Sequence, residues 1–255
     1  MTSNLPLKVN IITLFPEMFS ALHYGIVGRA IESGQLEYCC LNPREHTQNR
    51  NGYIDDSPYG GGPGMIMQAE PILACIDIAR QQLPKAFTIL LTPSGHRVEQ
   101  HTLQHLNSHH ELIIICGRYE GIDARLTRLT RIDAELSLGD FVLSGGEIAA
   151  MALIDSCARQ RPNVLGHPEG ATDDSFSDGL LEAPQYTRPK TLENQTVPGV
   201  LLSGNHADIR QWRRQQALGR TWRYRPDLLE KLELDTADQA LLLDYQQTFR
   251  EGEQT

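Results

Sequence analysis

The sequence from Leu138 to Glu147 reads Leu-Gly-Asp-Phe-Val-Leu-Ser-Gly-Gly-Glu, with three glycines around a short apolar run. Glycine lacks a Cβ atom, so it permits positive φ angles and a close approach of the backbone to a ligand. The pattern therefore indicates a strand that leads into a tight loop. From this stretch alone two interpretations stay open, because the loop could hold a ligand or could only turn the chain.

Two further glycine-bearing loops come earlier in the chain, each directly after an apolar run. Thr92-Pro-Ser-Gly95 follows Phe87–Leu91, and Gly117-Arg-Tyr-Glu-Gly121 follows Leu112–Cys116. Loops at the carboxyl ends of parallel strands share one edge of the sheet, where such sheets bind ligands. We therefore predict that the three loops form one pocket.

Short apolar runs alternate with amphipathic segments through the first 160 residues. This alternation predicts an α/β fold, with a parallel sheet covered by helices on both faces. Strands are expected at Lys8–Leu14, Leu36–Leu41, Phe87–Leu91, Glu111–Cys116 and near Ile132–Leu138. Helices are expected from Pro16 to Gly34 and at Glu70–Gln82, Glu99–Asn107 and Gly146–Arg161.

The character of the chain changes after Pro162. Residues 163–203 are rich in Pro, Gly, Asp, Ser and Thr and show little periodicity, which predicts a linker or a functional loop. The pattern is helical from Asn205 onward, with helices expected at Asp208–Leu218, Pro226–Leu232 and Thr236–Phe249. The predicted division is a domain at 1–162, an interdomain linker at 163–203 and a small all-α domain at 204–255.

Composition excludes several classes of protein. The five cysteines include no Cys-x-x-Cys pair and the nine histidines no His-Glu-x-x-His, which disfavours disulfides and a structural zinc. Neither dinucleotide nor P-loop glycine motifs are present, nor the Gly-x-Ser-x-Gly of hydrolases. The apolar runs are too short to span a bilayer and no leader is visible, so we expect a cytoplasmic protein without a membrane partner.

The charge is distributed unevenly. A formal net charge of −9 disfavours a protein that coats nucleic acid without specificity. The segment between Asp208 and Lys231 is nevertheless basic, and Trp212, Trp222 and Tyr224 are interleaved with its arginines.

Four motifs occur in a characteristic order: Tyr59–Met65, Cys116–Asp123, Gly139–Glu147 and Asp174-Ser-Phe176. They resemble those of bacterial tRNA (guanine-N1)-methyltransferases of the TrmD type, and the resemblance covers essentially the whole chain. It implies a parallel sheet with the deep trefoil knot of the SPOUT class, followed by the small all-α domain. It also implies a homodimer with the active site at the subunit interface, tRNA as the partner and methylation of N1 of guanosine 37, next to the anticodon.

The resemblance implies S-adenosylmethionine as the methyl donor, enclosed by the knot loops mostly through backbone groups. The residues implied at this site are Leu91, Thr92, Pro93, Ser94, Gly95, Gly117, Tyr119, Glu120, Gly121, Leu138, Gly139, Asp140, Phe141, Val142, Leu143, Gly145 and Gly146. A divalent cation, magnesium, is also implied, although the sequence shows no dedicated cage for it.

The chemistry needs a general base, because guanine N1 carries a proton at neutral pH and attacks the methyl group only as that proton leaves. Asp174 matches the family's base, and Arg159 matches the arginine that stabilises negative charge on O6. Simpler interpretations stay open for both residues. Asp174 could belong to a solvated acidic loop, and Arg159 could complement the dipole at a helix C-terminus.

The resemblance assigns the basic segment to tRNA, with Arg210, Arg213, Arg214 and Arg220 as candidate phosphate contacts. Asp55 matches a position that the family uses to read the base on the anticodon side. Two rival functions remain. One is a knotted methyltransferase acting on another RNA position, and the other is a non-catalytic RNA-binding module, which would not need Asp174 and Arg159 together.

Overall fold

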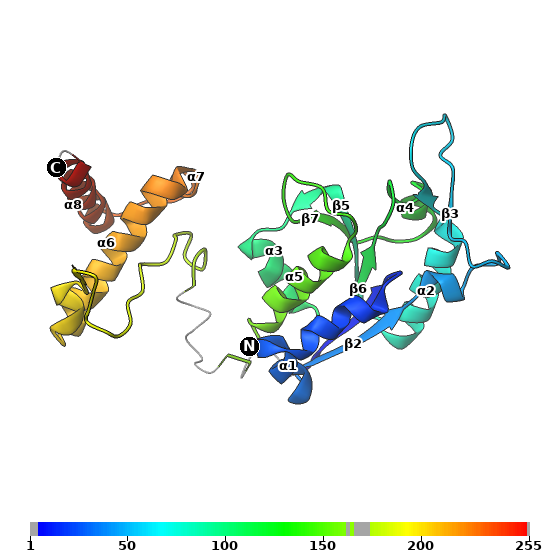
Figure 1. Ribbon diagram of the computed structural model, residues 1–255, viewed down its shortest axis with the longest axis horizontal. Coiled ribbons are helices and arrows are strands. Elements are labelled where there is room, and N and C mark those ends of the chain that lie inside the picture. The colour runs from blue at the N-terminus through cyan, green and yellow to red at the C-terminus, as the bar shows by residue number, and fades with distance from the viewer. Residues whose placement is uncertain (1–4, 162–163, 166–173, 254–255) are drawn as a thin grey trace. The chain divides into compact units, whose positions relative to one another are not determined.

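The computed structural model describes residues 5–161, 164–165 and 174–253. The chain divides into two compact units, Met1–Pro168 and Glu169–Thr255 (Figure 1). This boundary differs from the predicted one, because the residues from 174 to 202 belong to the second unit rather than to a separate linker. In the described part of the chain, no helix combines the length and the apolar character needed to cross a membrane.

The first unit is built on a five-stranded sheet in which every neighbouring pair is parallel, as the sequence predicted. The strand order is β2-β1-β6-β5-β7. The strands are β1 (Leu7–Ile12), β2 (Leu36–Leu41), β5 (Phe87–Arg97), β6 (Glu111–Cys116) and β7 (Ala134–Ser137). A two-stranded antiparallel ribbon, β3 (Asp55–Asp56) and β4 (Ile66–Met67), stands beside it.

Helices cover both faces of this sheet (Figure 1). One face packs against α1, α3 and α5, and the other packs against α2. In β6, Ile114 and Cys116 join the first cluster while Ile113 and Ile115 join the second, because successive side chains of a strand point to opposite faces. The helices of this unit are η1 (Pro16–His23), α1 (Gly25–Glu32), η2 (Pro43–Glu45), α2 (Ala69–Gln82), α3 (Gln100–Ser108), α4 (Leu126–Leu129) and α5 (Glu147–Ala158).

Among the differences from the sequence prediction, two change the course of the chain in the first unit. The single helix expected from Pro16 to Gly34 is two helices, η1 and α1, because the chain turns at their junction: Tyr24 is extended, and Gly25, the first residue of α1, has a left-handed backbone with φ of +67°. The strand expected to end at Leu91 runs on to Arg97 as part of β5. Its pairing with β7 shifts register between Leu91 and His96, so the Thr92–Gly95 loop is an irregularity within a strand rather than a turn after it.

The second unit is helical, as predicted, and α6 packs against α8. The close contact between α6 and α8 depends on Gly219, because a Cβ added there would lie 2.3 Å from Tyr245 Cδ1. Part of the segment 174–202 packs on this core, since Leu180 and Ala183 are buried and the Leu181 N–H donates to Thr221 on α6. The elements are the hairpin β8 (Thr191–Leu192) and β9 (Gln195–Thr196), then η3 (Gly199–Leu202), α6 (His206–Tyr224), α7 (Pro226–Leu229) and α8 (Thr236–Glu253).

Candidate functional site

The three predicted loops enclose one cavity of about 470 Å³, which lies at the carboxyl ends of β6 and β7 and at the irregularity within β5. The structure therefore brings together segments that are far apart in the sequence. The residues predicted from the resemblance that line the cavity are Leu91, Thr92, Pro93, Ser94, Gly117, Tyr119, Glu120, Gly121, Leu138, Phe141, Val142, Leu143, Gly145 and Gly146. The prediction missed other lining residues, among them Arg118, Asp123, Glu135, Leu136 and Ala149.

Gly95, Gly139 and Asp140 are described by the structure but lie outside this lining. Gly95 instead allows β5 and β7 to lie close together. A Cβ at this position would lie 2.5 Å from both Glu135 C and Leu136 N, so β5 and β7 could not keep their present spacing. The glycine is required for packing beside the pocket rather than for space within it.

We therefore expect Gly95→Ala to lower the free energy of unfolding by about 1–3 kcal/mol, because the clashing atoms are backbone and cannot move aside cheaply. Thermal or denaturant unfolding would measure the effect. Gly199→Ala is the matched control, since a Cβ there meets nothing within 4 Å. Equal stability of the two variants would contradict this account of Gly95.

The second and third loops are joined through backbone groups. The Gly146 N–H donates a hydrogen bond to the Gly117 carbonyl at 2.9 Å, and Arg118 and Gly145 form an antiparallel bridge. A Cβ on Gly146 would lie 2.7 Å from Cys116 Cα. The paired glycines of the third loop thus let it pack directly on the end of β6.

Arg118 and Glu147 form an ion pair beneath these loops that the sequence analysis did not identify. Arg118 Nε lies 2.9 Å from Glu147 Oε2, in a charge contact without hydrogen-bond alignment, and the Glu147 side chain is 0% exposed. The Thr13 hydroxyl donates to the other carboxylate oxygen at 2.9 Å. Arg118 also donates to the Ser144 carbonyl at 3.1 Å. One arginine therefore ties the third loop to the start of α5.

The ribbon β3–β4 is joined to the second loop by backbone hydrogen bonds. The Met67 N–H donates to the Gly121 carbonyl at 2.9 Å, and the Glu120 N–H donates to the Met65 carbonyl at 3.0 Å. Asp55 lies on β3 opposite Met67 and is half-buried. The Tyr59–Met65 motif is thereby fastened beside the cavity, with Tyr59 fully exposed.

The cavity lining is acidic, with Glu120, Asp123 and Glu135. Hydrogen bonds from the Arg125 side chain and backbone lower the pKa of Asp123 to about 2. Asp123 is therefore charged at neutral pH, but Arg125 balances that charge. The other acidic residues of the lining, Glu120 and Glu135, favour a ligand that carries positive charge.

The two predicted catalytic residues belong to different units. Arg159 caps the C-terminus of α5 in the first unit, where its N–H donates to the Asp155 carbonyl at 3.0 Å. Asp174 belongs to the second unit, is half-buried, and accepts a hydrogen bond from the Ser177 N–H through its carbonyl at 3.2 Å.

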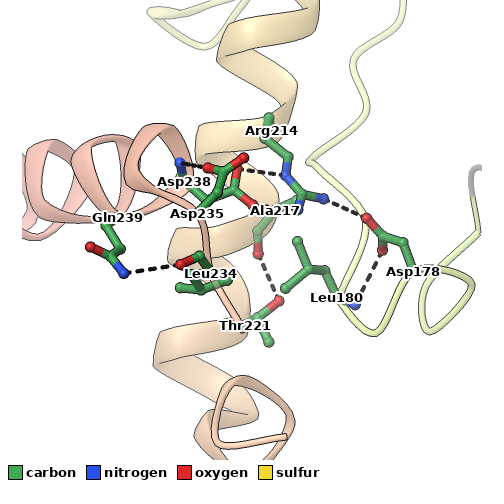
Figure 2. Close-up of polar contacts among 9 residues, drawn as sticks. All are labelled: Asp178, Leu180, Arg214, Ala217, Thr221, Leu234, Asp235, Asp238 and Gln239. Atoms are coloured by element: carbon green, nitrogen blue, oxygen red, sulfur yellow. Dashed lines mark hydrogen bonds and ion pairs between the residues drawn. The ribbon is translucent and has the colours of Figure 1, made fainter. Parts of the chain in front are cut away.

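The arginines predicted to contact tRNA all lie on α6, but their surroundings differ. Arg210 and Arg213 are exposed, whereas Arg220 is half-buried with its guanidinium 5.8 Å from the Tyr224 ring centre. Arg214 is held by two carboxylates, Asp178 and Asp238 (Figure 2). That pairing argues against the predicted phosphate contact for Arg214, because its charge is already balanced within the unit.

Comparisons with known proteins agree with this arrangement. A family model described as tRNA (Guanine-1)-methyltransferase TrmD matches residues 7–231. A Marinomonas protein named tRNA (guanine-N(1)-)-methyltransferase is 51% identical over 94% of this chain and 96% of its own length. A Cronobacter sakazakii protein of the same name is 53% identical over 92% and 91%.

A solved structure also matches. The crystal structure of tRNA (m1G37) methyltransferase from Aquifex aeolicus has a TM-score of 0.71 and 39% sequence identity, covering 89% of this chain and 96% of that one. The match of a family model to most of the chain, with relatives about half identical over nearly their full length, is decisive. The chain belongs to the TrmD family of tRNA (guanine-N1)-methyltransferases.

Proposed function

We propose that this enzyme methylates N1 of guanosine 37 in tRNA, with S-adenosylmethionine as the methyl donor. The observation that carries the proposal is the cavity enclosed by the three glycine-bearing loops, one within β5 and the others at the carboxyl ends of β6 and β7. Position 37 is supported by the likeness to the Aquifex aeolicus enzyme, whose title names m1G37.

The cavity fits the proposed donor in size and charge. Its volume of about 470 Å³ falls in the range of about 300–1,000 Å³ usual for small-molecule sites. Glu120 and Glu135 in its lining complement a sulfonium cation, and Leu91, Leu138 and Ala149 give it apolar walls. When bound, the donor supplies an electrophilic methyl group. The loops would hold it through backbone groups and exclude water from it.

Transfer to guanine N1 requires removal of its proton as the new N–C bond forms. We assign this step to Asp174, whose carboxylate accepts the proton. As the N1 proton leaves, negative charge develops on O6, and we assign its stabilisation to the Arg159 guanidinium.

We further propose the trefoil knot and the homodimer. The strand order supports the knot, because β7 lies beside β5 and the loop after β7 packs on the loop after β6 through Gly146 and Gly117. Exposed apolar side chains next to the cavity, Phe141, Val142 and Ile148, support a subunit interface there. We also propose that the active site lies at that interface and that the protein is cytoplasmic.

For tRNA, Arg210 and Arg213 are exposed on α6 and suit phosphate contacts. We propose Arg220 as a further contact and Asp55 as the reader of the base next to guanosine 37. Among the described residues, no group of three or more His, Cys, Asp or Glu side chains is arranged to hold a metal ion.

The test is a methyl-transfer assay with two tRNA transcripts that differ only in having G or A at position 37. We expect N1-methylguanosine to form in the first transcript and only background incorporation in the second, because adenine has no N1 proton and no O6. Equal incorporation into both would contradict the proposal. It would favour a methyltransferase that acts on another RNA position.

A further inference from the structure

Asp174 begins a short loop, residues 174–182, that is closed by its own hydrogen bonds. The Phe176 N–H donates to the Leu180 carbonyl at 2.6 Å, and the Glu182 N–H donates to the Ser175 hydroxyl at 3.0 Å. Phe176 has a left-handed φ of +75°. These bonds give the loop a defined shape, so its position depends on how it is attached to the helices.

One attachment is an ionic clasp, which we define as Asp178, Arg214 and Asp238 (Figure 2). Arg214 Nη1 lies 2.5 Å from Asp178 Oδ2 in the loop, and Arg214 Nη2 lies 2.6 Å from Asp238 Oδ2 on α8. The same guanidinium donates through Nε to Asp238 Oδ1 at 2.9 Å. Asp178 Oδ1 also accepts from the Leu180 N–H at 3.2 Å. The clasp therefore joins the loop to α6 and α8 through one side chain.

Two further contacts attach the same loop. Thr221 on α6 is 0% exposed, and its hydroxyl accepts from the Leu181 N–H at 2.9 Å while donating to the Ala217 carbonyl at 2.7 Å. Gly179 lies against Leu232, since a Cβ there would be 2.8 Å from Leu232 Cδ2. The loop that carries Asp174 is thus fixed to the helical part of its unit on more than one side.

We propose that Asp178 and Arg214 are positioning residues for methyl transfer, because they hold the loop that presents Asp174 to the target guanine. This inference rests on the proposed role of Asp174 as the base. A general base acts only within hydrogen-bond reach of its proton, and a displacement of about 1 Å can cost a large factor in rate. A fixed bidentate arginine suits the task, because its planar fork defines direction as well as charge.

The two arms of the clasp differ in exposure, and this allows a sharp test. The Asp178 side chain is 59% exposed, so its ion pair contributes little to stability, whereas Asp238 is only 15% exposed. Arg214 donates hydrogen bonds to Asp238 that lower the pKa of that carboxyl. Asp178→Asn therefore perturbs the loop attachment. Asp244→Asn instead perturbs a contact between α6 and α8, the hydrogen bond from Gln215, that involves neither the loop nor Arg214.

The experiment measures single-turnover methyl transfer with saturating tRNA and S-adenosylmethionine, well below the melting temperature of each variant of the full chain. We expect Asp178→Asn to lower the rate by about ten-fold or more with its Tm and tRNA Kd nearly unchanged. Asp244→Asn is expected to keep its rate within about two-fold of the parent at that temperature, because Asp244 contacts α6 through Gln215 and not through the clasp. Asp178→Glu, which keeps the charge, should recover part of the rate.

Combination with Asp174→Asn separates this proposal from the proposed function. If Asp178 acts through Asp174, adding Asp178→Asn to Asp174→Asn causes no further loss. If Asp174→Asn transfers the methyl group slowly but Asp178→Asn does so at the parent rate, the positioning role is overturned and Asp174 keeps its role as base. Normal turnover by Asp174→Asn would overturn both. A rise in tRNA Kd as large as the loss of rate would assign the clasp to RNA binding and overturn positioning.

Discussion

Asp174→Asn is expected to lower the rate of methyl transfer by about 10²–10⁴-fold, the effect typical of a lost general base. The amide is nearly the same size as the carboxylate but cannot accept the N1 proton. The hydrogen bond from the Ser177 N–H is made by the Asp174 carbonyl, so the substitution leaves it intact. Binding of S-adenosylmethionine and of tRNA should therefore be retained.

Single-turnover rates and separate binding titrations would measure this result. Glu182→Gln is the matched control, because Glu182 is an exposed carboxylate in the same loop, and it should keep the parent rate. The rate of Asp174→Asn should also recover partly at alkaline pH, where guanine N1 loses its proton to solvent. Near-normal turnover at neutral pH would remove Asp174 from the role of base.

Arg159→Gln is expected to lower the rate by about 10²–10³-fold, as removal of a group that stabilises a developing oxyanion commonly does. Gln can donate a hydrogen bond to O6 but brings no positive charge. The loss should fall mainly on kcat rather than on tRNA affinity, because the charge on O6 develops during the reaction.

The control distinguishes this role from a helix-dipole effect. Arg29 is an exposed basic residue in the last turn of α1, so Arg29→Gln loses a comparable interaction with a helix terminus. It should leave the rate unchanged. Equal losses in the two variants, or a loss by Arg159→Gln that appears only as weaker tRNA binding, would contradict the assignment.

Local sequence patterns predicted much of the first unit. The strands Leu36–Leu41 and Glu111–Cys116 have the predicted bounds, because each is an apolar run with clear ends. The helix predicted from Pro16 was wrong in its middle, since nothing in the apolar periodicity shows that Gly25 adopts a left-handed backbone. The end of β5 was also misplaced, because the strand resumes only after pairing with β7.

The sequence by itself determined the parallel sheet and the three loops that meet at its edge, since strand periodicity and glycine preference are properties of a short stretch of chain. Only the tertiary structure decided which polar side chains pair. Thr13 contacts Glu147 across 134 positions, and Arg214 contacts Asp178 across 36. Such partners are chosen by the path of the folded chain. For that reason Arg214, which the sequence suggested as a phosphate contact, forms the clasp with Asp178 and Asp238 in the fold. The glycines of Leu138–Glu147, in contrast, indicated a pocket from the sequence alone.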